Sequence, residues 1–241
     1  MLRLAALIPL ALVACVDSGD EGLYVVNNSA VTGTSCVLNG SPTQPQLGHG
    51  LIHVNSTLPY VMTPLLQSRI ATAENVDEVS KTIQLRGADV TLTLKAVSIE
   101  RDGQFTTTNP ETQLTQFSTL FSGSVAPGAS VNAFVDIIPP ATIRSVVAMS
   151  GANVETDSLN AEVLASVVVK GEINDDGIES QPYLYPVTIC NDCVFINRGL
   201  CTDFTGAAST GNACNPYQDG VVDCCTHSMT GYTCPAVPET M

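Results

Sequence analysis

The stretch Ala161-Glu162-Val163-Leu164-Ala165-Ser166-Val167-Val168-Val169 decides the fold class of this sequence. Every second residue in it is apolar, and side chains two residues apart lie on the same face of a β-strand. The pattern therefore predicts a strand with one buried face. The turn signal Asn174-Asp175-Asp176-Gly177 follows, and residues 183–189 alternate again. We expect the two runs to pair as a hairpin with a longer loop.

The same alternation recurs along residues 23–189. It is clearest over residues 90–96 and 131–137, and weaker over 23–26, 51–54, 60–66 and 117–122. Residues 83–85 also alternate, and Arg86-Gly87-Ala88-Asp89 predicts a tight connection from them to the strand at 90–96. Seven or more short strands at this spacing are typical of a sandwich. We expect a mainly β protein, an antiparallel β-sandwich that is Ig-like or similar.

One segment departs from the alternation. Pro139-Pro140 precedes Ile143, Val146 and Val147, which share one helical face, and Gly151 follows. Proline fits the first turn of a helix because its missing N–H has no partner there. Glycine readily takes the left-handed conformation just beyond the last turn. The segment therefore predicts a short helix.

The composition narrows the class of protein. The chain has 241 residues, of which 44% are hydrophobic and 13% charged, and its formal net charge is −14. Abundant apolar residues and few charges argue against a disordered chain. Attraction to nucleic acid or to anionic lipid headgroups needs clustered Lys or Arg, which this acidic chain lacks. We expect no nucleic-acid partner.

The amino terminus has the layout of an export signal. Arg3 provides a positive charge, and an apolar run covers residues 4–13. This run is too short for a membrane-spanning helix, which needs roughly 20 apolar residues. Small residues before a cut site are typical of a signal peptide, so we expect residues 1–14 to be removed.

Leu12-Val13-Ala14-Cys15 resembles the lipobox of bacterial lipoproteins. The resemblance implies that Cys15 becomes the first mature residue, with a diacylglycerol thioether on its sulfur and a third acyl chain, such as palmitate, on its amine. Several chains anchor a protein stably where one does not. In the sorting rule of such lipoproteins an Asp directly after the cysteine retains the protein in the inner membrane. Here that residue is Val16, so the expected location is the outer membrane, facing the periplasm or the cell surface. An ordinary cleaved signal, with Cys15 incidental, is the alternative.

The other eight cysteines support export independently. An even set in an oxidising compartment predicts four disulfides, with 105 connectivities among which the sequence does not choose. Seven of the eight lie between residues 190 and 234, and an odd set cannot pair within itself, so one bond must join Cys36 to the tail. We expect this longest loop to stabilise most, by ~4 to 5 kcal/mol in the chain-entropy model. The disulfide candidates are Cys36, Cys190, Cys193, Cys201, Cys214, Cys224, Cys225 and Cys234.

Two motifs imitate chemical sites. Cys190-Asn191-Asp192-Cys193 has the spacing of a redox-active dithiol, but the Asp192 carboxylate disfavours a thiolate, so we expect a structural disulfide. Residues 172–177 imitate the start of a calcium loop, but Tyr183 stands where that loop needs a bidentate Glu, and a hairpin turn is favoured. A zinc site built from the tail cysteines is disfavoured because exported thiols oxidise. We expect no metal and no cofactor.

His49 and His53 are separated by four residues, the spacing of paired metal ligands on a helix. Gly48 and Gly50 oppose a helix, and Gly50 stands where a metalloprotease needs Glu. On a strand the two histidines would still share a face. An exported enzyme, a hydrolase or a metal-dependent one, that uses His49 and His53 in a surface pocket is therefore the alternative function.

The whole layout resembles the Cys-rich outer-membrane lipoproteins of myxobacteria. The tail carries this resemblance, from Tyr185-Pro186-Val187-Thr188-Ile189-Cys190-Asn191-Asp192-Cys193 through Cys214-Asn215-Pro216 to Cys224-Cys225. It implies location and architecture, but no chemistry and no catalytic residue. We expect a signal peptide at 1–14, an acylated tether at 15–22, a β-sandwich at 23–189 and a Cys-rich module at 190–241 packed on it. The expected role is structural or binding, in adhesion or assembly, with outer-membrane lipid and an exported protein or a glycan as partners.

Overall fold

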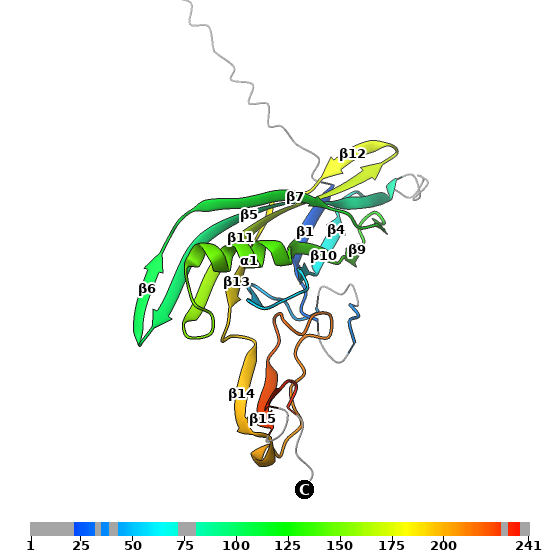
Figure 1. Ribbon diagram of the computed structural model, residues 1–241. Helices are drawn as coiled ribbons and strands as arrows, with labels where there is room; N and C mark the ends of the chain where they lie inside the picture. The colour runs from blue at the N-terminus through cyan, green and yellow to red at the C-terminus, as the bar shows by residue number, and fades with distance from the viewer. Residues whose placement is uncertain (1–21, 32–34, 39–42, 72–80, 228–230, 237–241) are drawn as a thin grey trace, which may run out of the picture.

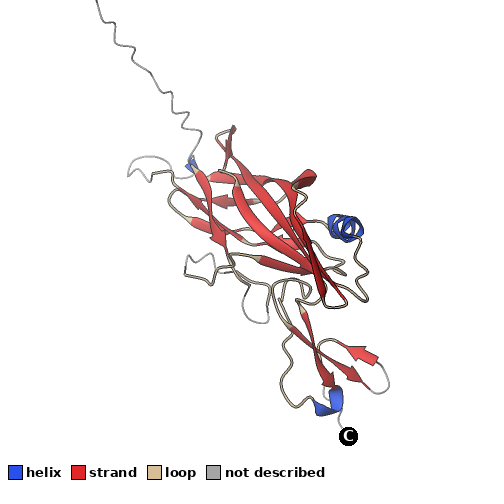
Figure 2. Cartoon of the chain, turned by 90° about the vertical axis from the view of Figure 1, so that its left-hand side faces the viewer, coloured by secondary structure: helices blue, strands red, loops and turns tan. Residues whose placement is uncertain are grey.

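The computed structural model describes residues 22–31, 35–38, 43–71, 81–227 and 231–236. The expected signal peptide and the acylation site Cys15 lie outside these ranges. Strands dominate the described residues, and the α-helix among them is α1 (Pro140–Ser150). Figures 1 and 2 show this mainly β architecture, which confirms the predicted fold class. No helix within the described ranges is long and apolar enough to cross a bilayer.

The larger sheet is built around β5 (Ile83–Arg101) and β11 (Ser158–Ile173), which run antiparallel along most of their length. The alternate residues of β11 from Ala161 to Val169 are fully buried, as their pattern predicts. In the described residues the sheet has eight strands in the order β2-β13-β11-β5-β6, with β12 on β11 and with β7 and β8 on β5. The added strands are β2 (Gly50–His53), β6 (Gln104–Thr108), β7 (Thr112–Thr119), β8 (Gly123–Val125), β12 (Asp176–Glu179) and β13 (Tyr183–Cys190).

The predicted hairpin is present, with a strand inside its loop. β11 pairs antiparallel with β13, where Val163 lies opposite Val187. Asn174 and Asp175 have φ values of 49° and 70°. Positive φ at two successive turn residues is typical of the tight turns that match the twist of a hairpin. The turn leads into β12, which pairs back onto the end of β11 before the chain enters β13.

The tight connection predicted at residues 86–89 is wrong, because β5 continues through it. The pairing of β5 with β11 shifts register between Lys170 and Gly171, where Arg86 is the extra residue of a bulge. Gly87 has φ 150°, and a Cβ at this position would overlap the carbonyl oxygen of Thr119. The glycine therefore permits a close approach between strands and does not mark a turn.

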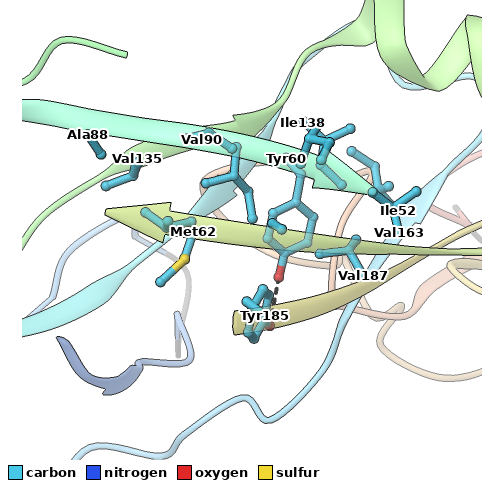
Figure 3. Packing of buried hydrophobic residues seen from close by; sticks show 14 of the residues in the cluster. Ile52, Tyr60, Met62, Ala88, Val90, Val135, Ile138, Val163, Tyr185 and Val187 are labelled. Carbon is cyan, nitrogen blue, oxygen red and sulfur yellow. Dashed lines mark hydrogen bonds between the residues drawn. The ribbon is translucent and has the colours of Figure 1, made fainter. Parts of the chain in front are cut away.

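A second layer packs against the larger sheet, and we name it the smaller layer. It consists of a three-stranded sheet, with β1 (Leu23–Asn28), β4 (Pro64–Ser68) and β9 (Ser130–Asn132), and beside it a separate two-stranded sheet, with β3 (Tyr60–Met62) and β10 (Val135–Ile138). The predicted runs 60–66 and 131–137 are each interrupted, at Thr63 and at residues 133–134. Met62 and Val135 of this layer meet Val90 and Val163 of the larger sheet in one buried core, part of which Figure 3 shows.

The predicted helix is confirmed as α1. Pro139 precedes it in an extended conformation, and Gly151 ends it in the left-handed region with φ 68°. Ile143 and Val146, on the predicted apolar face, are fully buried. The helix therefore adds one apolar face to the sandwich core.

The carboxyl-terminal tail forms a sheet of its own, with β14 (Phe195–Leu200) parallel to β15 (Val222–His227) and β16 (Gly231–Thr233) antiparallel to β15. A short 3-10 helix, η2 (Cys201–Asp203), follows β14. Figures 1 and 2 show this sheet extending from one end of the sandwich. Four disulfides pair all eight cysteines of the described ranges, as Cys36–Cys214, Cys190–Cys193, Cys201–Cys225 and Cys224–Cys234. The first confirms the predicted bond from Cys36 into the tail.

Candidate functional site

The tail returns to the sandwich through residues 212–220, which we name the docking loop. β2 is the first strand of the larger sheet, and it has a neighbour strand, β13, on one side. On its other side the docking loop takes the place of a strand. The His53 N–H donates to the Tyr217 carbonyl at 2.9 Å, and the Asp219 N–H donates to the Leu51 carbonyl at 3.0 Å. The loop therefore covers a sheet edge that would otherwise offer free backbone groups.

The docking loop also bonds to β3 of the smaller layer. The Gln218 side chain accepts from the Val61 N–H at 2.8 Å and donates to the Val61 carbonyl at 2.9 Å. Asn215 donates to the Pro59 carbonyl at 2.9 Å. Both side chains are almost completely buried. The docking loop therefore joins β2 of the larger sheet to β3 through its backbone and its polar side chains. The Cys36–Cys214 disulfide ties the loop to the residues that follow β1.

Three side chains from distant parts of the chain meet beneath the loop. The Tyr60 hydroxyl donates to Asp219 Oδ2 at 2.7 Å and lies 3.0 Å from the Tyr185 hydroxyl. Figure 3 shows the two tyrosines, one from each sheet, pointing toward one another in the core. Gly50 completes the arrangement, because a Cβ there would overlap the Tyr60 hydroxyl. We name Tyr60, Tyr185 and Asp219 the seam cluster.

Burial controls the acidity of the seam cluster. Burial raises the pKa of Asp219 to about 6, although hydrogen bonds from the Leu51 N–H, Tyr60 and Gln218 oppose the shift. Burial likewise raises the pKa of Tyr185 to about 12 and that of Tyr60 well above its usual value of 10.0. Both tyrosines are therefore neutral near pH 7. Asp219 is the member of the cluster that changes charge between acidic and neutral pH.

His53 has a structural role in this arrangement. It is 7% exposed, its Nε2 is 2.9 Å from the Asn191 carbonyl oxygen, and its Nδ1 accepts the Asn55 N–H at 3.1 Å. Its ring packs edge-on against Phe195 at 4.8 Å. Burial lowers the pKa of His53, an effect that the Asn191 carbonyl partly opposes. Since both ring nitrogens have partners within the protein, this neutral imidazole has no free position for a metal or a substrate proton.

His49 lies apart from that site. It precedes β2, and its exposed ring is hydrogen-bonded to Thr188 at 2.8 Å. Neither histidine lines the cavities at the β5–β6 turn, between α1 and β7 or around Leu120. In the described part of the chain, no three His, Cys, Asp or Glu side chains are grouped as metal ligands. His49 and His53 therefore have separate hydrogen-bonding partners, and the enzyme alternative stays a prediction.

A cavity of about 460 Å³ between the β5–β6 turn and residues 154–158 is strongly acidic. Asp157, at its wall, is hydrogen-bonded to Arg101 at 2.5 Å and to the Asn153 N–H at 2.9 Å. These bonds, with the Arg101 bond the larger effect, lower the pKa of Asp157 to about 2. Such a cavity attracts cations, but its buried carboxylate already has its partners. Other cavities lie between α1 and β7, beside the β5–β6 turn, and around Leu120.

Sequence patterns alone did not predict that the three residues of the seam cluster meet. Tyr60 and Tyr185 belong to alternating runs, which indicated only that they face a core, and Asp219 is one acidic residue in a Cys-rich tail. A usable signal was the crowding of Asn215, Gln218 and Asp219 beside Cys214. Polar side chains next to a long-range disulfide are well placed to dock on another part of the fold, because the disulfide holds that segment against it.

No family model and no curated protein matches the chain. Among solved structures, a protein from Archaeoglobus fulgidus is similar with a TM-score of 0.35 and 12% identity, over 60% of this chain and 95% of that one. Spo0M, a sporulation control protein from Bacillus subtilis, is similar with a TM-score of 0.23 and 10% identity, over 58% of this chain and 50% of that one. At such TM-scores neither structure informs the fold or the function of this chain.

Proposed function

We propose that this chain is a lipid-anchored protein of the cell envelope, held at the outer membrane by acyl chains on Cys15, with a structural or binding role. The pairing of all eight cysteines in the described ranges carries the proposal, because structural disulfides persist in oxidising compartments. The sequence has nine cysteines, and the remaining one, Cys15, is not paired with any of these eight. An exported lipoprotein is expected to have this count, with an even number of disulfide cysteines and one further cysteine that carries the lipid.

The position of Gly22, the first described residue, supports one orientation for the anchored protein. Gly22 lies against Ile178 of β12. Figure 1 shows β12 at one end of the body and β14 and β15 at the other. Since few residues separate Cys15 from Gly22, an anchor at Cys15 holds the β12 end near the membrane. The tail sheet then points away from the membrane, toward exported partners.

β6 and the tail sheet, which lie away from β12, also carry exposed apolar side chains. All five residues of β6 are exposed, and Phe105 among them is 75% exposed. Tyr232 on β16 of the tail sheet is 55% exposed. Aromatic side chains combine an apolar body with low conformational entropy and are favoured at contact surfaces. We propose that β6 and the tail sheet contact an exported protein or a glycan, and the chain's acidity makes nucleic acid an unsuitable partner.

The anchor is tested by feeding cells an alkynyl palmitate and comparing the wild-type protein with Cys15→Ser. We expect label on the wild type alone, recovery of the wild type in the outer-membrane fraction, and no thiol that reacts with maleimide in the unreduced, denatured protein. Cys15→Ser removes the acylated thiol and leaves the disulfide cysteines intact. An unlabelled wild type with reactive thiols contradicts the proposal.

The binding role is tested by placing a photo-crosslinking residue at Phe105 or Tyr232 in intact cells. Leu120 is the matched control, because it is 87% exposed but lies toward the β12 end of the body. It lines a cavity with Lys170, and Lys170 lies opposite Glu179 of β12. We expect adducts, identified by mass spectrometry, from Phe105 and Tyr232 but not from Leu120. Adducts of equal yield at all three positions, or self-contacts alone, count against a distal binding surface.

A further inference from the structure

The docking loop holds its place with neutral groups and one ionisable carboxyl. Asn215 and Gln218 contribute amides, and the backbone pairs with β2, but Asp219 is the loop's acidic residue. Its Oδ1 accepts the Leu51 N–H at 2.8 Å, and its Oδ2 accepts from Tyr60 at 2.7 Å and from Gln218 at 3.1 Å. These donors are uncharged, so none of them supplies a full positive charge to an ionised Asp219.

The titratable groups packed around Asp219 come from three strands. Tyr60 on β3 donates to Asp219 directly, and Tyr185 on β13 is bonded to Tyr60. β2 contributes His53, whose N–H pairs with the loop at Tyr217. Both tyrosines stay neutral between pH 4 and pH 8, because burial raises the pKa of each. The charge balance of the seam therefore depends on Asp219 and on His53.

Docking imposes different costs on the two forms of Asp219. An ionised carboxylate loses most of its hydration when the loop covers the sheet edge, whereas a protonated carboxyl loses little. In a loop that has moved off the edge, both forms are hydrated by water. Proton uptake at Asp219 therefore favours the docked loop, and proton loss favours the released loop.

We propose that the docking loop is a proton-responsive strap, in which proton uptake at Asp219 tightens the loop over the edge formed by β2 and β3 and proton loss loosens it. The Cys36–Cys214 disulfide lies within the strap and limits how far it moves. Release uncovers the backbone groups of Leu51, His53 and Val61 that the loop occupies. Those groups are the ones to which an added strand from a partner would bond. The strap does not depend on the proposed envelope role.

His53 responds in the opposite direction. Its imidazole is held neutral, with Nδ1 accepting from Asn55, and a proton on Nδ1 would remove that bond. Because burial lowers the His53 pKa below 6.5, acidification below that value loosens the β2 side of the seam. The two groups therefore have to be separated by mutation before the pH dependence of the strap is assigned to Asp219.

The test is hydrogen exchange of the Leu51, His53 and Val61 amides between pH 4 and pH 8, corrected for intrinsic rates, in the His53→Gln background. The docked Asp219 pKa is about 6 and the usual value is 3.8. Linkage then predicts that release of the loop becomes about 55-fold more favourable between pH 4 and pH 7, of which about 30-fold is reached by pH 6. Adding Asp219→Asn mimics the protonated carboxyl and should abolish this dependence.

Asp136→Asn is the matched control, because burial also raises the pKa of Asp136, which lies on β10 opposite Val61 but outside the loop. It should leave the pH dependence of the three amides unchanged. Replacing Cys36 and Cys214 by Ser should speed exchange at every pH without moving the midpoint. Protection that does not vary with pH, or a dependence that survives Asp219→Asn, overturns the strap. Unchanged exchange in the cysteine double variant overturns the restraining role of the disulfide.

Discussion

Gln218 pairs with Val61 through both hydrogen-bonding groups of its side-chain amide, accepting the Val61 N–H at 2.8 Å and donating to the Val61 carbonyl at 2.9 Å. This is the bonding that a neighbouring strand would supply, and here a single side chain from the tail provides it. An amide suits the position because it offers one donor and one acceptor side by side. The free edge of β3 is therefore closed by a residue that lies 157 positions away in the sequence.

Replacing Gln218 should show how much this closure contributes to stability. Gln218→Ala leaves the Val61 N–H and carbonyl without partners at a half-buried position, and an unpaired group away from water costs about 1 to 3 kcal/mol. We expect the free energy of unfolding, measured with urea, to fall by about 3 kcal/mol. Gln116→Ala, at an exposed site on β7, should change it by less than about 0.5 kcal/mol. Equal effects of the two substitutions would contradict the edge-closing role of Gln218.

The contact between Gly50 and Tyr60 predicts a steric effect. Gly50→Ala places a Cβ where the Tyr60 hydroxyl lies, and that hydroxyl is held by Asp219 and Tyr185 in a fully buried site. We expect a loss of about 2 kcal/mol or more, because overpacking a core costs about 1 to 3 kcal/mol and the hydroxyl also leaves its partners. Gly48→Ala is the control on the same segment, since nothing lies within 4 Å of its added Cβ. Comparable thermal unfolding of the two variants would refute the close fit at Gly50.

The four disulfides should differ in how much they stabilise the fold. Cys36–Cys214 closes a separation of 178 residues, whereas Cys190–Cys193 closes a separation of 3. In the chain-entropy model these bonds restrict the unfolded chain by about 5 and about 2 kcal/mol. Urea unfolding of the two double Cys→Ala variants measures the difference. A larger loss on removing Cys190–Cys193 would show that local packing outweighs loop length.

Alternation of apolar residues predicted the strands whose neighbours lie close in sequence. β11 and β13 follow their patterns because one face of each is buried in the core and the other is not. The pattern could not show that β5 continues through Gly87, because a bulge and a turn require the same glycine. It also could not show the breaks at Thr63 and at residues 133–134, where side-chain alternation hides a change of pairing.

The site was less accessible to sequence reasoning. An odd number of tail cysteines required a bond from Cys36, but spacing did not single out Cys214. Tyr60 and Asp219 are 159 residues apart, and nothing local to either predicts that they meet. These two residues meet only because the layers of the sandwich pack together and the tail folds back onto them. The spacing of His49 and His53 predicted a common face, but it could not show that the first would be exposed and the second buried.

Asp157 should give the protein an acid-sensitive contribution opposite in sign to that of Asp219. Hydrogen bonds from Arg101 and from the Asn153 N–H lower its pKa to about 2, below the usual 3.8. A group with a lowered folded-state pKa stabilises the fold above its unfolded pKa, and the contribution is lost as the pH falls through the folded value. We therefore expect wild-type stability to fall between pH 4 and pH 2, whereas the contribution of Asp219 is lost as the pH rises through about 6.

Asp157→Asn isolates this contribution, because an amide keeps the size of the carboxyl but does not titrate. The variant should be less stable than the wild type at pH 7 and should lose less stability between pH 4 and pH 2, as measured by urea unfolding at each pH. Asp176→Asn, at the exposed start of β12, should keep the wild-type acid dependence. If Asp157→Asn and the wild type lose stability in parallel on acidification, the Arg101 bond does not control this carboxyl.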